Sequence, residues 1–171
     1  MIPTNASDGL LTLGLAQIAP VWLDRTRTLE KVCAYVEQAA QRGCNLVAFG
    51  EALAPGYSFW LELTDGARFN SPLQKEIFAD YARQAVQIEA GHLDDVCAAA
   101  ARHRIAVYLG SIERPPDRGG HSLYCSLVYI DANGAPSGAF IVSSCRLMKS
   151  ALRGLRAMAT VCVRIRWAHF M

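Results

Sequence analysis

The chain has 171 residues, of which 52% are hydrophobic and 19% charged, a balance typical of one soluble domain with its own core. No apolar run is long enough to cross a bilayer, and the first residues lack the basic and apolar regions of a signal peptide, so we expect a cytoplasmic protein. The formal net charge of +2 hides an asymmetry, because residues 141–171 hold six Lys or Arg and no Asp or Glu.

Strands and helices are predicted along most of the chain. In chain order we expect a strand over residues 11–18, a helix over 24–42, a strand over 46–49, helices over 71–85 and 92–103, and strands over 105–112 and 123–130. Asp24 or Thr26 can cap the first helix, and Gly43 can adopt the left-handed conformation that ends it. Ser71 and Pro72 together are typical of a helix start. If the first two strands are parallel neighbours, the helix between them makes a right-handed crossover.

Six cysteines and four histidines are scattered along the chain. No two cysteines have the CxxC spacing, and no group of cysteines and histidines has the spacing of a zinc site. We therefore expect free thiols in a reducing compartment, and no metal ligand among the histidines.

A carboxylate follows the strand predicted over residues 46–49. Glu51 comes two residues after that apolar run, and Pro55-Gly56 then signals a turn. The carboxyl ends of parallel strands are where open α/β sheets bind ligands, so an acid at this place can serve as a general base. Position alone nevertheless favours a solvated residue at a strand end, because most such carboxylates do no chemistry.

The residues around Glu51 follow a longer pattern. A glycine is followed by an apolar pair, a phenylalanine, the glutamate and then Pro-Gly-Tyr, at Gly43, Leu46, Val47, Phe49, Glu51, Pro55, Gly56 and Tyr57. This pattern resembles the first signature of the nitrilase branch of the carbon–nitrogen hydrolase superfamily. Two positions depart from it, since Ala54 replaces a larger aliphatic residue and Ser58 replaces a final proline.

The resemblance covers residues 10–140 and implies an α/β fold, the nitrilase-like α-β-β-α sandwich, incomplete at the C-terminus and built into a homo-oligomer. It implies hydrolysis of a small nitrile or amide by a cysteine thiolate, with Glu51 as general base and a lysine that stabilises the developing charge. No metal or organic cofactor is implied. Tyr57 and Trp60 become candidate substrate-binding residues, although covering the core is an equally good interpretation of both. Glu113, at the end of another predicted strand, becomes a candidate supporting residue.

The family pattern stops close to the change in charge. A strand bearing His-Arg-Lys-Leu, with the essential lysine, should follow the hairpin signal at 131–134, but residues 141–149 do not match it in register. Codons permitted for residues 140–161 can be chosen so that a second reading frame encodes a family-like string. This frame starts at the last nucleotide of codon 140 and reads His-Arg-Lys-Leu-Met-Pro-Thr-Tyr-Glu-Glu-Arg-Phe. Only the first glutamate of this family-like string, and one glycine beyond the part quoted, are forced by the protein sequence.

We therefore interpret residues 141–171 as a non-family basic tail that is out of frame. The chain then lacks the lysine and the nucleophilic cysteine, and we expect it to be inactive. One alternative is a genuine basic tail that binds an acidic surface, such as nucleic acid or acidic lipid. Another is a non-catalytic fragment, or a subunit that pairs with an intact homologue. The preferred interpretation includes neither nucleic acid nor a membrane as a partner.

Overall fold

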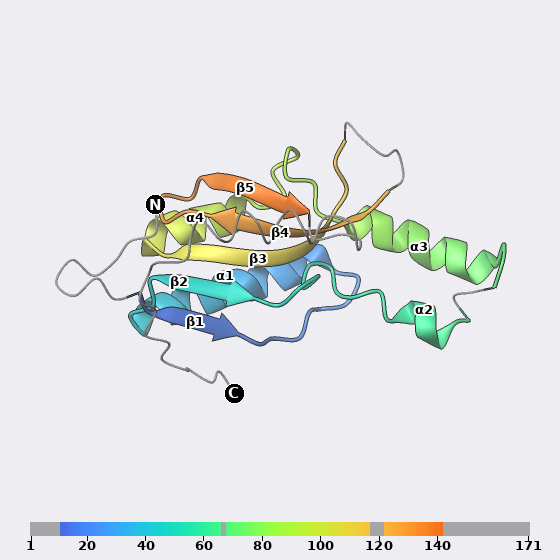
Figure 1. Ribbon diagram of the computed structural model, residues 1–171, viewed down its shortest axis with the longest axis horizontal. Helices are drawn as coiled ribbons and strands as arrows, with labels where there is room; N and C mark the ends of the chain where they lie inside the picture. Colours follow the sequence, from blue (N-terminus) through green and yellow to red (C-terminus); the bar gives the residue numbers. More distant parts are fainter. Residues whose placement is uncertain (1–10, 66–67, 117–121, 142–171) are drawn as a thin grey trace, which may run out of the picture.

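The computed structural model describes residues 11–65, 68–116 and 122–141. In chain order the elements are β1 (Leu13–Ala16), α1 (Arg25–Gln41), β2 (Leu46–Phe49), α2 (Trp60–Leu63), α3 (Pro72–Gln84), α4 (Asp94–His103), β3 (Ala106–Glu113), β4 (Tyr124–Ile130) and β5 (Pro136–Ile141) (Figure 1). Each predicted element is present, with ends that differ by a few residues. Of the tail predicted over residues 141–171, Ile141 is the last residue of β5 and the rest lies outside the described residues.

The five strands form one sheet in the order β1-β2-β3-β4-β5. The strands β1, β2 and β3 are parallel, whereas β4 and β5 continue the sheet as antiparallel neighbours. The first two strands are thus parallel neighbours, which was the condition for a crossover between them. Because β1, β2 and β3 run in the same direction, their carboxyl ends meet at one edge of the sheet, where ligand sites of α/β proteins lie.

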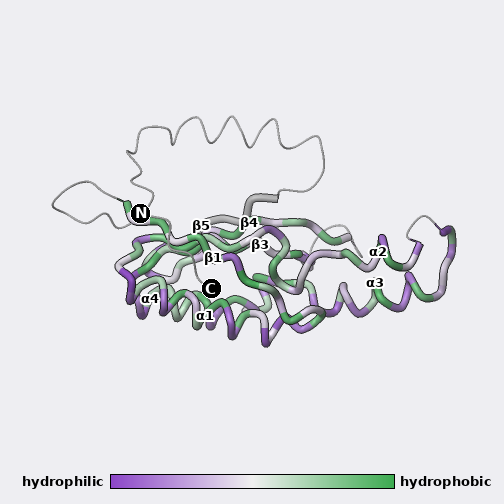
Figure 2. The backbone as a smooth tube through the Cα atoms, turned by 90° about the horizontal axis from the view of Figure 1, so that it is seen from below, coloured by the Kyte–Doolittle hydropathy of each residue, from purple (hydrophilic) through white to green (hydrophobic). Residues whose placement is uncertain are grey.

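Helices α1 and α4 cover one face of the sheet, and α2 and α3 extend beyond its end (Figure 2). The core lies between the sheet and the two covering helices. Its central side chains are Leu29, Val32, Val36 and Ala39 from α1, Val96, Ala99 and Ala100 from α4, and Val47, Val107, Leu109, Val128 and Ile130 from the strands. The helical spacing of the first two groups explains why these segments form helices, since it gathers their apolar side chains on one face.

The predicted helix ends are formed by local hydrogen bonds. Of the two possible caps for α1, the structure uses Asp24, whose carboxylate accepts a hydrogen bond from the backbone N–H of Arg27 at 2.9 Å. Gly43 has a φ of +76°, as predicted for the residue that ends this helix. The hydroxyl of Ser71 caps α3, accepting from the N–H of Gln74 at 3.5 Å.

The hairpin between β4 and β5 forms at the predicted turn. The carboxylate of Asp131 accepts hydrogen bonds from the backbone N–H groups of Asn133 at 2.8 Å and Ala135 at 3.0 Å. These two donors stabilise the charged form and so lower the pKa of Asp131. Gly134 has a φ of +79°, which this turn requires. Within the described residues, no helix combines the length and apolarity needed to cross a membrane.

Candidate active site

Glu51 lies at the carboxyl end of β2, where the chain turns away from the sheet. The strand residues before it are buried or half-buried, whereas the Glu51 side chain is exposed. Immediately after it, Ala52 has a φ of +51°, an uncommon conformation for a residue with a Cβ atom. Strained backbone of this kind persists only where the surrounding structure holds it in place.

The segment after Glu51 is held against the end of β3. The backbone N–H of Leu53 donates to the carbonyl of Gly110 at 3.0 Å, and the N–H of Ile112 donates to the carbonyl of Ala54 at 2.8 Å. Residue 110 must be glycine for this approach, since a Cβ atom there would lie 2.3 Å from the Gly50 carbonyl oxygen. The same atom would lie 2.6 Å from the Cα atom of Glu51. The backbone of the candidate base is therefore fixed by direct contact with β3.

Cys125, on β4, contacts the Glu51 side chain. Its thiol Sγ donates to Glu51 Oε1 at 3.3 Å, and it also accepts a hydrogen bond from the backbone N–H of Ala52. Burial, the hydrogen bond to Glu51 and the charge of Glu51 together raise the pKa of the Cys125 thiol to about 11. Sequence reasoning missed this residue, because only the register of β3 with β4 brings it to the end of β2.

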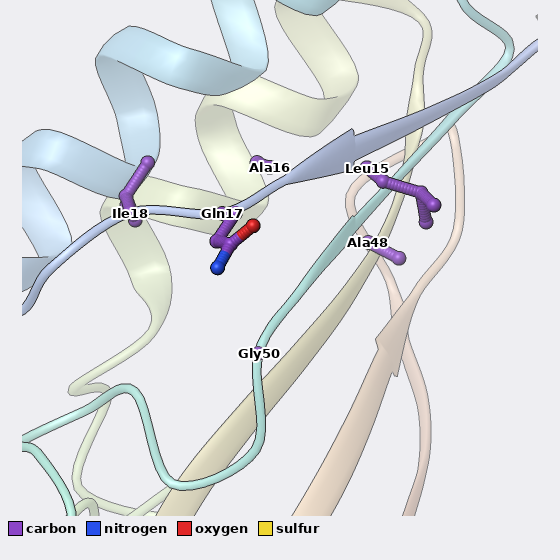
Figure 3. Close-up of a pocket in the computed structure, with 6 residues that line it drawn as sticks. All are labelled: Leu15, Ala16, Gln17, Ile18, Ala48 and Gly50. Atoms are coloured by element: carbon purple, nitrogen blue, oxygen red, sulfur yellow. The ribbon is translucent and has the colours of Figure 1, made fainter. Parts of the chain in front are cut away.

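A cavity of about 380 Å³ opens beside Glu51. It is lined by Ile18, Pro20, Trp22, Gly50, Glu51, Ala52, Leu53, Tyr57 and Phe59. A second cavity, of about 230 Å³, adjoins it through Ile18 and Gly50, and the amide of Gln17 lies there between the ends of β1 and β2 (Figure 3). Neither cavity is lined by a Lys or Arg of the described residues, so the anionic group facing the larger one, Glu51, has no cationic neighbour there.

The two candidate substrate-binding residues have different surroundings. Tyr57 is 65% exposed and lines the larger cavity, and its carbonyl accepts a hydrogen bond from the Trp22 indole at 3.3 Å. Trp60 is only 4% exposed, does not line either cavity, and packs edge-on against Tyr81 with ring centroids 6.3 Å apart. The Tyr81 hydroxyl in turn donates to the carbonyl of Gly56 at 2.8 Å. Trp60 thus packs beneath the loop that carries Tyr57, and contact with substrate stays a prediction for both.

Glu113 is the last residue of β3 and is buried, with 4% of its surface exposed. Its carboxylate accepts a hydrogen bond from the Ser126 hydroxyl on β4 at 2.6 Å. It lines neither cavity, and it lies three residues beyond Gly110 in the strand that holds the Glu51 segment. Its proposed supporting role stays a prediction. No group of His, Cys, Asp and Glu among the described residues could hold a metal ion.

Known proteins are similar to the chain in both sequence and fold. A family model described as carbon-nitrogen hydrolase matches residues 12–146. An arylacetonitrilase of Aspergillus niger is 34% identical over 122 residues, which make up 71% of this chain and 33% of that protein. Nitrilase 2 from an unknown prokaryotic organism is 34% identical over 126 residues, or 74% of this chain and 38% of that protein. The chain therefore spans about a third of the length of these relatives.

Solved structures share the fold at low sequence identity. A double mutant of the amidase from Nesterenkonia sp. AN1, in complex with acrylamide, superposes with a TM-score of 0.55 at 14% identity, covering 82% of this chain and 45% of that chain. The C. elegans NitFhit protein gives a TM-score of 0.54 at 15% identity, covering 77% of this chain and 27% of that chain. These likenesses confirm the predicted nitrilase-like α/β architecture, of which the chain carries a part. On the family match and the nitrilase relatives, the chain belongs to the carbon-nitrogen hydrolase family.

Proposed function

We propose that the intact form of this protein is a nitrilase, which hydrolyses a nitrile to a carboxylic acid and ammonia with Glu51 as the general base. The observation that carries the proposal is the place of Glu51, which faces an otherwise mostly apolar cavity at the carboxyl end of a parallel strand. Relatives that bear the name arylacetonitrilase or aliphatic nitrilase favour a nitrile over an amide as substrate.

Glu51 would act as a proton carrier in this reaction. A cysteine thiol supplied by the missing part of the fold attacks the nitrile carbon, so that an S–C bond forms as its proton passes through Glu51 to the nitrile nitrogen. Water then displaces ammonia from the resulting thioimidate and a second water releases the acid from the thioester, again with Glu51 receiving and returning protons. Among the described residues, the Glu51 carboxylate is the only charged group that lines the cavity, and its other walls are mostly apolar.

We further propose that the chain in its present form is inactive. Covalent catalysis needs a nucleophile and a group that stabilises the developing negative charge, and neither cavity offers a Lys or Arg among the described residues. Cys125 is near Glu51, but the raised pKa of its thiol keeps it protonated and weakly nucleophilic at neutral pH. The catalytic lysine and cysteine would be encoded in the other frame, downstream of residue 140.

The test begins with the nucleotide sequence from codon 130 to well beyond the stop. We expect that one restored base opens a frame that encodes His-Arg-Lys-Leu and, later, a cysteine strand. The restored protein should release ammonia from phenylacetonitrile or propionitrile, and Glu51→Gln should lower its kcat by about 10²–10⁴-fold, the usual contribution of a general base. A frame without these motifs, or a restored protein whose rate is unchanged by Glu51→Gln, would refute the proposal.

The proposed homo-oligomer rests on the family resemblance alone, and the proposed cytoplasmic location rests on the sequence expectations stated above. Sedimentation velocity of the restored protein tests the first, because a monomer at micromolar concentration would contradict it. Fractionation of cells that express the restored gene tests the second.

A further inference from the structure

We propose that Cys125 is a positioning residue for Glu51, whose thiol holds the carboxylate in one orientation at the mouth of the cavity. The functional meaning of this proposal rests on the proposed role of Glu51 as a base, but the hydrogen bond itself can be tested without any turnover. The argument starts from a contrast between the backbone of Glu51, which is fixed, and its side chain, which is exposed.

The backbone contacts leave the carboxylate free to move. Gly110 packs directly against the Gly50 carbonyl and the Glu51 Cα atom, and Leu53 is bonded to the same strand. These contacts set where the side chain begins, but three rotatable bonds separate the Cα atom from the carboxylate oxygens. An exposed glutamate without further contacts populates several rotamers, whereas a catalytic base must hold one.

The thiol supplies the contact that the backbone cannot. Cys125 lies in β4 directly opposite Ile112 of β3, so its position is set by the sheet. The N–H of Ala52 donates to Sγ, and Sγ donates to Oε1 of Glu51 at 3.3 Å. The sulfur therefore has a backbone donor in Ala52 and a carboxylate acceptor in Glu51. The φ of +51° at Ala52 belongs to the same turn that presents this N–H to Cys125.

The protonation state of the Cys125 thiol is the one that a hydrogen-bond donor requires. Burial and the charge of Glu51 keep the thiol neutral well above physiological pH, as a hydrogen-bond donor must be. A cysteine that served as nucleophile would need the opposite, a pKa lowered by a cation or a helix N-terminus. The phenol of Tyr81, which lies close enough to influence this thiol, also has a raised pKa and adds no charge near neutrality.

The first experiment measures how fast each thiol of the full chain reacts with iodoacetamide between pH 7 and pH 10, by peptide mass spectrometry. Glu51→Gln removes the charge that holds the Cys125 proton, so alkylation of Cys125 should accelerate about tenfold for each pKa unit recovered. Cys44 is the internal control, since burial is the main cause of its raised pKa and Glu51 is not among the causes. An unchanged rate at Cys125, or an equal acceleration at Cys44, would overturn the proposal.

The second experiment asks whether the thiol orients the carboxylate. Side-chain couplings measured by NMR should report one χ1 rotamer for Glu51 in the wild-type chain, rotamer averaging in Cys125→Ala, and restored order in Cys125→Ser, which keeps a donor. If Cys125 served only in packing, Cys125→Ala would leave the Glu51 couplings unchanged, which would contradict a positioning role. Should a Cys125 variant fail to fold, the Glu51→Gln experiment still decides, because it alters only an exposed side chain.

The infrared S–H stretch gives a third measurement. The band that Cys125→Ser removes should lie at lower frequency than the bands of the other thiols, and it should move up in Glu51→Ala as the hydrogen bond is lost. A band at the frequency of a free thiol in the wild-type chain would refute the bond directly. Neither this frequency nor the alkylation rates depend on nitrile hydrolysis, so a failure here is distinguishable from a failure of the proposed function.

Discussion

The helices that cover the sheet and the helices beyond its end bury their apolar side chains very differently. On α1, Val32 and Val36 are fully buried against the sheet. On α2 and α3, Leu63 is 75% exposed and Leu73 is 51% exposed. Apolar side chains at helical spacing therefore form a core only where the chain also provides the opposing surface, which the described residues do for α1 and α4 but not fully for α2 and α3.

The largest expected effect comes from the same truncation made in both regions. Leu109→Ala, in β3, should lower the free energy of unfolding by about 2–5 kcal/mol, because Leu109 is completely buried and its loss leaves a cavity. Leu63→Ala, in α2, should change it by no more than about 0.5 kcal/mol, since that side chain is mostly in solvent. Urea unfolding followed by circular dichroism measures both. Equal losses of unfolding free energy in the two variants would show that Leu63 is buried against a surface outside the described residues.

A smaller effect is expected from adding one methyl group where β2 leaves the sheet. Gly110→Ala places a Cβ atom 2.3 Å from the Gly50 carbonyl oxygen, so the strand or the Glu51 segment must shift, at about 1–3 kcal/mol. Gly50→Ala is the matched control, because nothing lies within 4 Å of a Cβ atom at that position. The same urea titration compares them, and faster alkylation of Cys125 in Gly110→Ala would show that the Glu51 segment moved. If Gly110→Ala left the free energy of unfolding unchanged, the close contact between Gly110 and the Glu51 segment would not be needed.

The helix caps of the two regions should also differ in how much they stabilise the protein. Asp24→Ala should lower global stability by about 1 kcal/mol, since Asp24 caps a helix whose buried face belongs to the main core. Ser71→Ala removes a longer and weaker cap from α3, so we expect less global loss and instead faster amide exchange confined to the first turns of that helix. Hydrogen exchange measured by mass spectrometry separates the two outcomes. Uniform acceleration in Ser71→Ala would place α3 in the same cooperative unit as the core.

These contrasts also show what the sequence could predict. The cap at Ser71, the end at Gly43 and the hairpin turn follow from interactions within a few residues and were predictable. For the cap of α1 the sequence left two candidates, Asp24 and Thr26, and the structure uses Asp24. The sequence left the parallel pairing of β1 with β2 as a condition, because a helix between two strands does not decide which strand lies beside which. The partial exposure of α3 was not, because periodicity gives the direction of an apolar face and says nothing about what covers it.

In the candidate site, too, some residues could be predicted from the sequence and others could not. Glu51 could be found because a strand, a carboxylate and a turn lie together in the sequence and match a family pattern. Cys125 could not, because it is distant in sequence and is brought to Glu51 by the pairing of β3 with β4. The different surroundings of Tyr57 and Trp60 also depend on how the loop folds back over Tyr81. Local patterns therefore indicate a candidate residue, whereas the long-range strand register decides what surrounds it.

The smallest expected effect lies in the connection between α3 and α4, where the two regions join. The Nδ1 atom of His92 accepts a hydrogen bond from the backbone N–H of Gln87 at 3.0 Å, which requires a neutral ring in that tautomer. Burial lowers the pKa of His92, and the positive charges of Arg25 and Arg114 lower it further. The unfolded chain therefore binds a proton at His92 more readily than the folded chain does.

Stability should consequently fall as the pH drops through about 6.5, the ordinary pKa of histidine, and level off once the folded form is also protonated. The urea midpoint measured between pH 8 and pH 5 should show this slope in the wild-type chain. His92→Asn should flatten it, because Oδ1 of asparagine can accept the same hydrogen bond without titrating. If the slope is unchanged in His92→Asn, another group is responsible. If the pH dependence is seen only as faster amide exchange near residues 87–92, and not in the urea midpoint, the connection opens locally and the two regions unfold as separate units.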